Sequence, residues 1–358
     1  MEGFTSFFGS VPDPRADNAR YDLTSVLFIA LAALLCGADS CADMSDFGES
    51  KKSLLRQVLR LPYGVPSHDT FSRVFRHLDP EAFEAAFARF AAAFAKGMNG
   101  VVAIDGKAVR GAYKRGCKTS PLHLVNVWAA ETKLVIGQRL APGRNEVKGV
   151  LEALSLLSLE GCIVTADALH CRADTAQAIL ATGADYALAL KDNQPGLLAK
   201  VVACLEDAHD PDTASTQAVT AHDRTEIRRS VVVPVTDIDF PGLVAVACVE
   251  GTRQTPDGAT TSFTRRFLLS KQLTASAVLQ VVRTHWTIEN QLHWVLDVHF
   301  NEDAARNRKD HAPQNLATLR KIALNLIRLH PDKASIRRKI KKAGWDDHFL
   351  LSILSHMR

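Results

Sequence analysis

Two aspartates each follow a short apolar run that is typical of a buried strand. Asp105 comes after residues 101–104 and before Gly106, which allows a sharp turn, and Asp167 comes after residues 162–166. Two strands that each deliver one carboxylate from their end suit Mg²⁺, which takes oxygen ligands from a few carboxylates and from substrate phosphates. A single aspartate at a strand end is also a common turn or cap residue, so a third element has to decide.

A glutamate on a predicted helix provides that third element. We expect a long helix from Thr274 to about Phe300, in which Glu289 has His285 four residues before it and His293 four residues after it. Burying an ionised glutamate among the apolar neighbours on this helix is costly unless it is paired or bound to a metal. This favours a metal ligand over an ordinary salt-bridged glutamate.

The composition is that of a globular protein without a membrane span. The chain has 358 residues, 47% of them hydrophobic and 23% charged, which is enough for two domains or one large domain with additions. Its longest apolar run, residues 26–36, is too short for a bilayer, which needs about 20 apolar residues, and predicts a buried helix. The seven cysteines are scattered and form no CxxC pair, which favours a reducing cytoplasm over a disulfide framework or a zinc ribbon.

The elements that carry the carboxylates belong to an α/β pattern that follows a helical beginning. The predicted helices are residues 21–36, 44–61, 67–78 and 81–96, and later 146–159 and 173–182. The predicted strands are residues 101–104, 122–130, 134–140, 162–166 and 185–190. Residues 205–272 are rich in strand-like runs, with a turn at residues 255–258. This order predicts a sheet with mixed strand pairing.

Two parts of the chain are basic in a way that suits a polyanion. Residues 306–342 hold twelve Lys and Arg against two acids, although a solvated helix face explains the same pattern. The helix at residues 67–78 buries one apolar face and shows Arg73 on the other, together with His68, Arg76 and His77. A turn before a short basic helix suits the recognition helix of a helix-turn-helix motif, and a plain surface helix is the alternative.

Several long blocks, in the right order, resemble the ISAs1 family of DDE transposases, also called H-repeat-associated proteins, within the IS4-like class. The blocks are FFGSVPDPRADNARYDL, IDGKAVRGA, TADALHCR, DYALALKDNQP and HWTIENQLHWVLDVHFNEDAARNR, and the resemblance extends over nearly the whole chain. The resemblance implies an RNase H-like α/β fold with a mixed sheet and a β-rich insertion. It also implies an N-terminal all-helical domain and a basic helical C-terminus.

The resemblance divides the chain into five segments. They are residues 1–98, an N-terminal helical DNA-binding domain; 99–204, the first part of the catalytic domain; 205–273, the β-rich insertion; 274–330, the rest of the catalytic domain with the Glu helix; and 331–358, a basic C-terminal helical tail. The long separation between Asp167 and Glu289 then reflects the insertion that lies between them.

The family's catalytic and metal-binding triad falls on Asp105, Asp167 and Glu289. The resemblance implies two Mg²⁺ ions, which Mn²⁺ can replace, with Asp105 bridging both and the other two carboxylates holding one each. Water frees the 3′-OH of the element end, and that hydroxyl attacks target DNA. DNA contacts are expected from Lys107, Arg110, His170, Lys191, Asn193, Arg73, His285 and Trp286. Lys107, Arg110, Lys191 and Asn193 could hold phosphates and His170 a water or a phosphate, with solvated surface residues, or a buried hydrogen-bonded His170, as the alternatives.

The expected partners are double-stranded DNA, as terminal inverted repeats and target DNA, and a second copy of the chain when it assembles on DNA. We expect a cytoplasmic protein that joins the nucleoid when bound to DNA, and no membrane partner. The wider IS4 signature has Tyr, Arg and Lys around its Glu, where this chain has Val282, His285 and Leu296. The DNA contacts of those three residues are therefore not transferred.

Three other functions compete with a transposase. A zinc hydrolase would use His285, Glu289 and His293, but the helix lacks the HExxH spacing. A catalytically silent DNA-binding derivative conflicts with the intact acidic triad. A related DNA endonuclease without strand transfer is not separable by sequence, and flanking inverted repeats in the genome would distinguish it.

Two further patterns give expectations of their own. On a regular helix Trp286 lies roughly 60° from Glu289 and Trp294 about 140°, so only Trp286 is expected at the rim of the cleft, where it could hold an unstacked base. Trp294 is expected in the core. The alternating His222, Arg224, Glu226 and Arg228 share one face of a strand, as a family-typical block or as a charge ladder on an edge strand.

Overall fold

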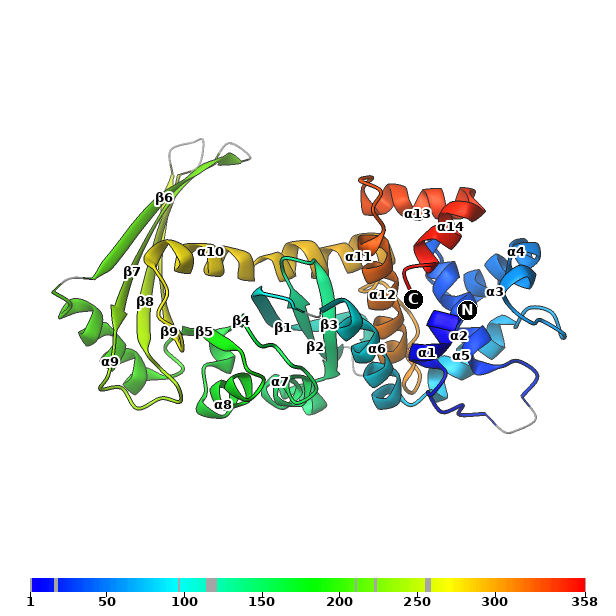
Figure 1. Cartoon of the computed structure of the whole chain (residues 1–358), viewed down its shortest axis with the longest axis horizontal. Coiled ribbons are helices and arrows are strands. Elements are labelled where there is room, and N and C mark those ends of the chain that lie inside the picture. The colour runs from blue at the N-terminus through cyan, green and yellow to red at the C-terminus, as the bar shows by residue number, and fades with distance from the viewer. Residues whose placement is uncertain are drawn as a thin grey trace.

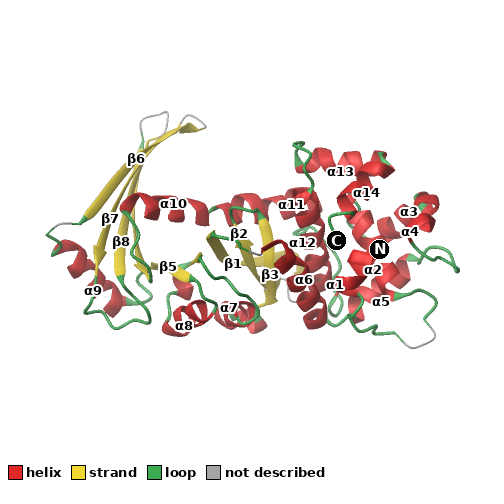
Figure 2. Cartoon of the chain, viewed as in Figure 1, coloured by secondary structure: helices red, strands yellow, loops and turns green. Residues whose placement is uncertain are grey.

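A computed structural model describes residues 2–15, 19–95, 97–113, 121–209, 211–221, 224–254 and 259–357. The molecule is elongated, with a helical bundle at one end, a long sheet through the middle, and the sheet's last strands at the other end (Figure 1). The colouring by secondary structure makes this division plain (Figure 2). Within the described residues, no helix combines the length and the apolar character that a membrane crossing requires.

The N-terminal helices form a bundle around one very apolar helix. They are α1 (Glu2–Phe8), α2 (Leu23–Leu35), α3 (Cys41–Ser50), α4 (Lys52–Val58), α5 (His68–His77) and α6 (Pro80–Ala95). Helix α2 is buried along almost its whole length, as its apolar sequence predicts, and the Asp22 carboxylate caps it by accepting from the Ser25 NH. The C-terminal helices α12 (Ala312–Leu329), α13 (Ile336–Trp345) and α14 (Asp347–Leu354) pack against α2, so both chain ends build this bundle.

One helix prediction in this bundle is wrong. Residues 44–61 form two helices, α3 and α4, which meet at Lys51. Helix α3 begins three residues earlier than predicted because Ser40 and Asp43 form a capping box, in which each side chain accepts from the other residue's backbone NH. Apolar spacing alone does not indicate this short polar start of α3.

A nine-stranded sheet runs in the order β3-β2-β1-β4-β5-β9-β8-β7-β6 through the described residues. Its strands are β1 (Gly100–Tyr113), β2 (Pro121–Ala129), β3 (Leu134–Leu140), β4 (Cys162–Ala166), β5 (Asp185–Leu190), β6 (Asp212–Ala221), β7 (Arg224–Pro234), β8 (Ala245–Gln254) and β9 (Thr260–Leu269). Strands β1, β4 and β5 are parallel neighbours, and the other pairs are antiparallel. The chain is therefore a mixed α/β protein with a largely antiparallel sheet.

Strand β1 is much longer than predicted. Residues 101–104 are only its beginning, and Asp105 lies inside the strand, because β1 keeps pairing with β2 as far as Val109. Gly106 pairs with Val125 in this register and makes no turn. The polar residues after Ile104 can continue a buried strand because the Lys107 side chain is itself buried.

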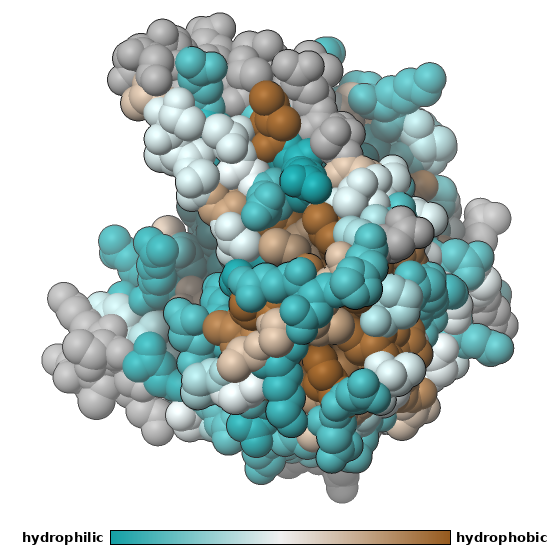
Figure 3. Space-filling model, turned by 90° about the vertical axis from the view of Figure 1, so that its left-hand side faces the viewer, coloured by the Kyte–Doolittle hydropathy of each residue, from teal (hydrophilic) through white to brown (hydrophobic). Residues whose placement is uncertain are grey.

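The strand-rich residues 205–272 extend the same sheet. Strand β9 pairs with β5, and β8, β7 and β6 follow outward, while α9 (Pro195–Glu206) packs against β7 and β8. The predicted turn at residues 255–258 lies outside the described residues. Viewed from this end, hydrophobic residues gather over the middle and lower part of the surface, with hydrophilic residues between and around them (Figure 3).

The two faces of the central sheet carry different helices. Helices α7 (Glu146–Leu154) and α8 (Ala173–Ala181) cover one face, with α7 ending five residues before the predicted boundary. Along the other face run α10 (Ala275–His285), a π-helical turn (Ile288–His293) and α11 (Trp294–Phe300) (Figure 1). The predicted helix from Thr274 to Phe300 thus exists, but it contains a six-residue π segment, and Glu289 lies in that segment.

Candidate active site

The sheet register places two of the predicted carboxylates next to each other. Ile104 of β1 and Ala166 of β4 are Cα partners on neighbouring parallel strands, so Asp105 and Asp167 follow at the same level. Neighbouring strands lie about 4.8 Å apart. The side chain of Asp105 is 17% exposed and that of Asp167 is 55% exposed. The site is therefore half inside the sheet and half open to solvent.

The π segment brings the third carboxylate to the same place. Ligand atoms of Asp105, Glu289 and His293 all lie within 4.8 Å of one another. His293 Nδ1 is 3.3 Å from Glu289 Oε2 and 3.7 Å from Asp105 Oδ2. The Glu289 side chain is 50% exposed, so this carboxylate bears only part of the burial cost that its apolar neighbours in the sequence suggested.

His293 is the member of this group that sequence reasoning assigned only to the zinc alternative. It is buried, and its Nε2 lies 3.3 Å from Asn126 Nδ2 on β2. The spacing of four residues from Glu289 was the available signal, but nothing in the sequence pointed to Asn126. In the described residues, the group that could hold a metal contains His293 and includes neither His285 nor Asp167, which lie 3.9 Å from each other.

The carboxylates make this site strongly acidic. Burial, reinforced by the charges of Glu289 and Asp167, raises the pKa of Asp105 to about 8. The hydrogen bond from His293 lowers the pKa of Glu289 to about 2. The two shifts are opposite because Asp105 is the more deeply buried partner, so in the absence of a cation the shared proton sits on Asp105.

The donor set fits a divalent cation. Two facing carboxylates with a third beside them repel one another, and a cation between them relieves that repulsion and displaces the proton from Asp105. The oxygen-rich set and the buried imidazole together are able to hold a divalent metal ion.

A small cavity lies beside Asp167. It is lined by Thr165, Ala166, Asp167, Ala187, Ala189, Lys191, Arg265, Phe267, Val281, Val282, His285 and Trp286. His285 Nδ1 is 2.9 Å from Thr165 Oγ1, and its Nε2 is 3.9 Å from Asp167 Oδ1. Trp286 is 40% exposed at the rim, and the Arg265 guanidinium lies 4.8 Å from the centre of its ring.

Polar contacts hold the turn that follows Asp167. Glu146 at the start of α7 lies between two imidazoles, 2.8 Å from His123 Nε2 and 3.6 Å from His170 Nε2. Hydrogen bonds from these histidines lower the pKa of Glu146 to about 2. On the other side, Asn193 donates to the Ala168 carbonyl at 2.9 Å.

These contacts involve two residues that we predicted to contact DNA. His170 is buried, so the alternative of a buried histidine with a polar partner is the one the structure has. The Asn193 amide is used by the Asp167 turn. Glu146 and His123 were missed because they come from separate elements that only the fold brings together.

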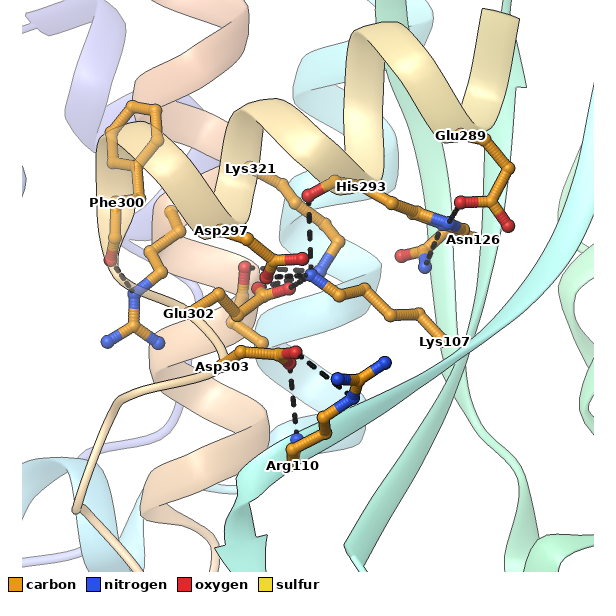
Figure 4. A network of polar contacts seen from close by, with 12 residues as sticks. Lys107, Arg110, Asn126, Glu289, His293, Asp297, Phe300, Glu302, Asp303 and Lys321 are labelled. Carbon is orange, nitrogen blue, oxygen red and sulfur yellow. Dashed lines mark hydrogen bonds and ion pairs between the residues drawn. The ribbon is translucent and has the colours of Figure 1, made fainter. Parts of the chain in front are cut away.

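Lys107 is also not free to bind phosphate. Its side chain is 7% exposed, and its ammonium contacts the carboxylates of Asp297 and Glu302 and donates to the His293 carbonyl (Figure 4). Arg110 is different, because its side chain is 84% exposed and only loosely paired with Asp303 at 3.5 Å. Lys191 is exposed at the edge of the Asp167 cavity.

The basic residues that were predicted to form surfaces are exposed only in part. Arg73 is exposed on α5 and lines a surface cavity with Arg15, Arg20 and His77. Among the twelve basic residues of 306–342, however, Arg320, Lys321 and Lys339 are buried. Periodicity did not reveal this, because these side chains serve carbonyl and carboxylate groups inside the fold.

Two other expectations concern exposed positions. Trp294 was predicted in the core but is 56% exposed, because the π segment shifts the residues after it around the helix axis. In the charged stretch on β7, Arg228 pairs with Glu226 at 2.9 Å, but β7 lies between β8 and β6, so the expectation of an edge strand is wrong. His222 lies outside the described residues.

Comparisons with known proteins agree with this geometry. Residues 5–91 match the family model described as DDE_Tnp_1-associated, and residues 96–326 match the one described as Transposase DDE domain. The "H repeat-associated putative transposase YhhI" of Escherichia coli (strain K12) is 32% identical, over 96% of each chain. The "Putative transposase YncI" of Escherichia coli O157:H7 is 31% identical, over 99% of this chain and 95% of its own length.

The chain belongs to the DDE transposase family. Within that family, its relatives are the H-repeat-associated transposases, and the resemblance to the ISAs1 kind is confirmed. The first family model ends within α6, at residue 91, and the second begins at residue 96, between α6 and β1.

Proposed function

We propose that this chain cleaves DNA at the ends of its element and transfers the freed 3′-OH ends into target DNA. The observation that carries the proposal is the position of the three acids: Asp105 and Asp167 follow the register partners Ile104 and Ala166, and ligand atoms of Asp105 and Glu289 lie within 4.8 Å of each other. The order β3-β2-β1-β4-β5, antiparallel and then parallel, supports an RNase H-like catalytic core. Membership in the DDE transposase family supports the same reaction class.

The three carboxylates would hold the divalent metal, which we propose to be Mg²⁺, with Mn²⁺ able to replace it. Bound divalent ions activate an attacking water or hydroxyl and stabilise the leaving oxygen of a phosphodiester. Asp105 offers the most central oxygen atoms, since its neighbours include both other carboxylates. His293 donates toward Glu289 and so fixes the orientation of that carboxylate.

The residues around the carboxylates would hold the DNA. Arg110 and Lys191 present exposed charges on either side of the site, and Arg265 adds a third beside Trp286. Such cations position a phosphate backbone without reading its sequence. Arg73 and the exposed cations of α13 lie on the helical bundle, where they would contact DNA farther from the cleavage site.

We propose that the partner is double-stranded DNA carrying the element's terminal inverted repeats, and that two copies act together. The described part of one chain offers one such acidic site, whereas an element has two ends to cut and join. The cytoplasm, with its nucleoid, is the compartment where this substrate is found.

The test uses purified full-length chain and DNA ends taken from the genomic sequence on both sides of its gene. With Mg²⁺, a labelled end should yield a 3′-OH at the element boundary, and a supercoiled plasmid should yield joined products. Asp105→Asn, Asp167→Asn and Glu289→Gln should each abolish both products, while Glu152→Gln, an exposed acid on α7, should change neither.

Other results would identify the competing functions. Cleavage without joined products would indicate an endonuclease. DNA binding with no cleavage in any divalent metal would indicate a silent derivative and overturn the proposal.

A further inference from the structure

Strand β1 contacts the helix that carries Glu289 at a second point, beyond the acidic site. Asp105 and Lys107 are two residues apart and therefore point to the same face of the sheet. Asp105 lies at Glu289 and His293, whereas Lys107 reaches the following turn of the same helix (Figure 4). The strand and the helix are thus joined at two successive levels.

The Lys107 ammonium has three acceptors, and all belong to the Glu289 helix or to the loop that follows it. It contacts the Asp297 carboxylate, lies 3.0 Å from Glu302 Oε2, and donates to the His293 carbonyl at 3.4 Å. Those carboxylates raise the pKa of Lys107, so the ammonium stays charged although it is buried. The three acceptors lie within residues 293–302, which makes Lys107 a clamp on the end of the π segment and the chain that follows it.

Glu302 is held in place from the opposite side. Asn301 ends α11 in the left-handed conformation, with φ of 54°, and the NH of Glu302 donates back to the Leu296 carbonyl at 3.2 Å. Lys321 of α12 lies 3.4 Å from Glu302 Oε1, and both side chains are fully buried. The clamp therefore connects β1 to α12, which packs on the helical bundle.

A π segment needs such support, because it contains one residue more than an α-helix of the same span and is uncommon except at functional sites. If the segment relaxed to α-helix, the residues before it would rotate by about 100° relative to those after it. Glu289 would then no longer face Asp105.

We infer that Lys107 is a positioning residue. Through His293, Asp297 and Glu302 it holds the π segment in register with β1, and so keeps Glu289 opposite Asp105. The purpose of this arrangement, which is to present paired carboxylates to a divalent cation, rests on the proposed function. The positioning role itself does not.

The main variant is the double substitution Lys107→Met with Glu302→Gln. It removes one buried cation and one buried anion together, so the buried cluster keeps its charge balance while the clamp on the helix is lost. The matched control is Arg139→Met, which removes a similarly buried cation, 2.7 Å from Glu84, elsewhere in the sheet. A milder second variant, Asp297→Asn, weakens the clamp and leaves the Glu302–Lys321 pair intact.

Two measurements on the full-length chain decide the question. The first is amide hydrogen exchange, for which we expect faster exchange over residues 288–297 in the double variant and, less strongly, in Asp297→Asn, with Arg139→Met like the wild type there. The second is Mn²⁺ affinity, read from the spin-resonance signal of free Mn²⁺. We expect the Kd to rise by about tenfold or more in the double variant, as for other outer-shell partners, and to stay unchanged in the control.

The outcomes separate the two proposals. Wild-type exchange over residues 288–297 in both clamp variants would overturn the role of Lys107. If the double variant does not fold, Asp297→Asn provides the test, because the Asp297 carboxylate is partly exposed and its replacement disturbs the interior less. If the wild type does not bind Mn²⁺, that result contradicts the proposed function instead. The hydrogen-exchange rates over residues 288–297 would still test whether Lys107 holds the π segment.

Discussion

The side-chain nitrogen of Asn126 lies 3.3 Å from His293 Nε2, inside the interface between the sheet and the Glu289 helix. With the amide donating to Nε2, the ring proton of a neutral His293 sits on Nδ1 and faces Glu289 and Asp105. A residue on β2 thus decides whether the ring nitrogen that faces the acidic site carries the proton.

Asn126→Leu should therefore weaken metal binding without unfolding the protein. The loss of an outer-shell partner typically reduces metal affinity by about 10- to 100-fold. Mn²⁺ titration of the variant, with a melting curve alongside, measures both effects. Affinity equal to the wild type would show that His293 does not need Asn126 to orient it.

Asp105→Asn should stabilise the metal-free protein while it abolishes cleavage. The folded-state pKa of Asp105 is about 8, above its ordinary 3.8, so this group costs stability as pH rises from about 4 toward 8. Asn takes up no proton on folding, so the variant should have a higher free energy of unfolding at pH 7, on the order of 4 kcal/mol, because pH 7 lies about three units above the ordinary pKa.

Melting curves with and without Mg²⁺ check this prediction. Mg²⁺ should raise the melting temperature of the wild type, because it binds only the folded state, and should have little effect on Asp105→Asn. At pH 4 the two metal-free proteins should have similar stability. A variant that melts below the wild type at pH 7 would contradict the predicted sign.

Glu146→Gln should affect the protein in the opposite sense. The folded-state pKa of Glu146 is about 2, below its ordinary 4.5, so its contribution to stability is present above about pH 4.5 and disappears as pH falls toward 2. The variant should lose about 1–2 kcal/mol at pH 7, because the bridge between His123 and His170 is lost. Denaturant unfolding at pH 7 and pH 3 should show a difference between variant and wild type that shrinks at the lower pH, and Glu152→Gln on the same helix is the control.

Helix α13 offers a direct comparison of surface and interior cations. Arg337, Arg338 and Lys341 are exposed, whereas Lys339 is buried and donates to the carbonyls of Ile327 and His330. Neutralising the three exposed residues should weaken DNA binding and flatten its dependence on salt, since fewer counterions are released. Lys339→Met should instead lower the melting temperature.

Binding isotherms at several salt concentrations separate these effects. An unchanged salt slope in the triple variant would exclude α13 from the DNA interface.

The sequence predicted the short elements of this fold better than the long ones. The bounds of β3, β4 and β5 agree with the prediction, because Gly, Asp and Lys residues bracket clear apolar runs. Strand β1 was cut short at Asp105, since polar residues in a strand look like an end until their partners across the sheet are known. The pairing of β9 with β5 carries no local signal.

The candidate site shows the same division. The types and order of Asp105, Asp167 and Glu289 could be recognised along the chain, but their supporting residues could not. Lys107 looks like a phosphate ligand because its acceptors, Asp297 and Glu302, lie far from it in sequence. The π segment is equally hidden, since an insertion of one residue in a helix changes no residue type.

The two exposed tryptophans of the Glu289 helix should behave differently on DNA. Trp286 lies at the rim of the Asp167 cavity under the Arg265 guanidinium, whereas Trp294 lies beyond the π segment and 5.8 Å from the His299 ring. An aromatic face beside the scissile phosphate can hold a base that has left the duplex stack. Trp286→Ala should therefore impair cleavage of intact duplex ends and spare ends that are already nicked or mismatched.

Trp294→Ala is the matched control, because its side chain is the more exposed of the two and should contribute little to stability. Stacking on an aromatic side chain is worth about 1–3 kcal/mol per base, so the expected loss for Trp286→Ala is roughly 5- to 150-fold on duplex ends. Cleavage rates on intact and mismatched ends, with melting curves for both variants, provide the comparison. Equal losses on both kinds of end, or a large drop in the melting temperature of Trp286→Ala, would show that Trp286 serves packing and holds no base.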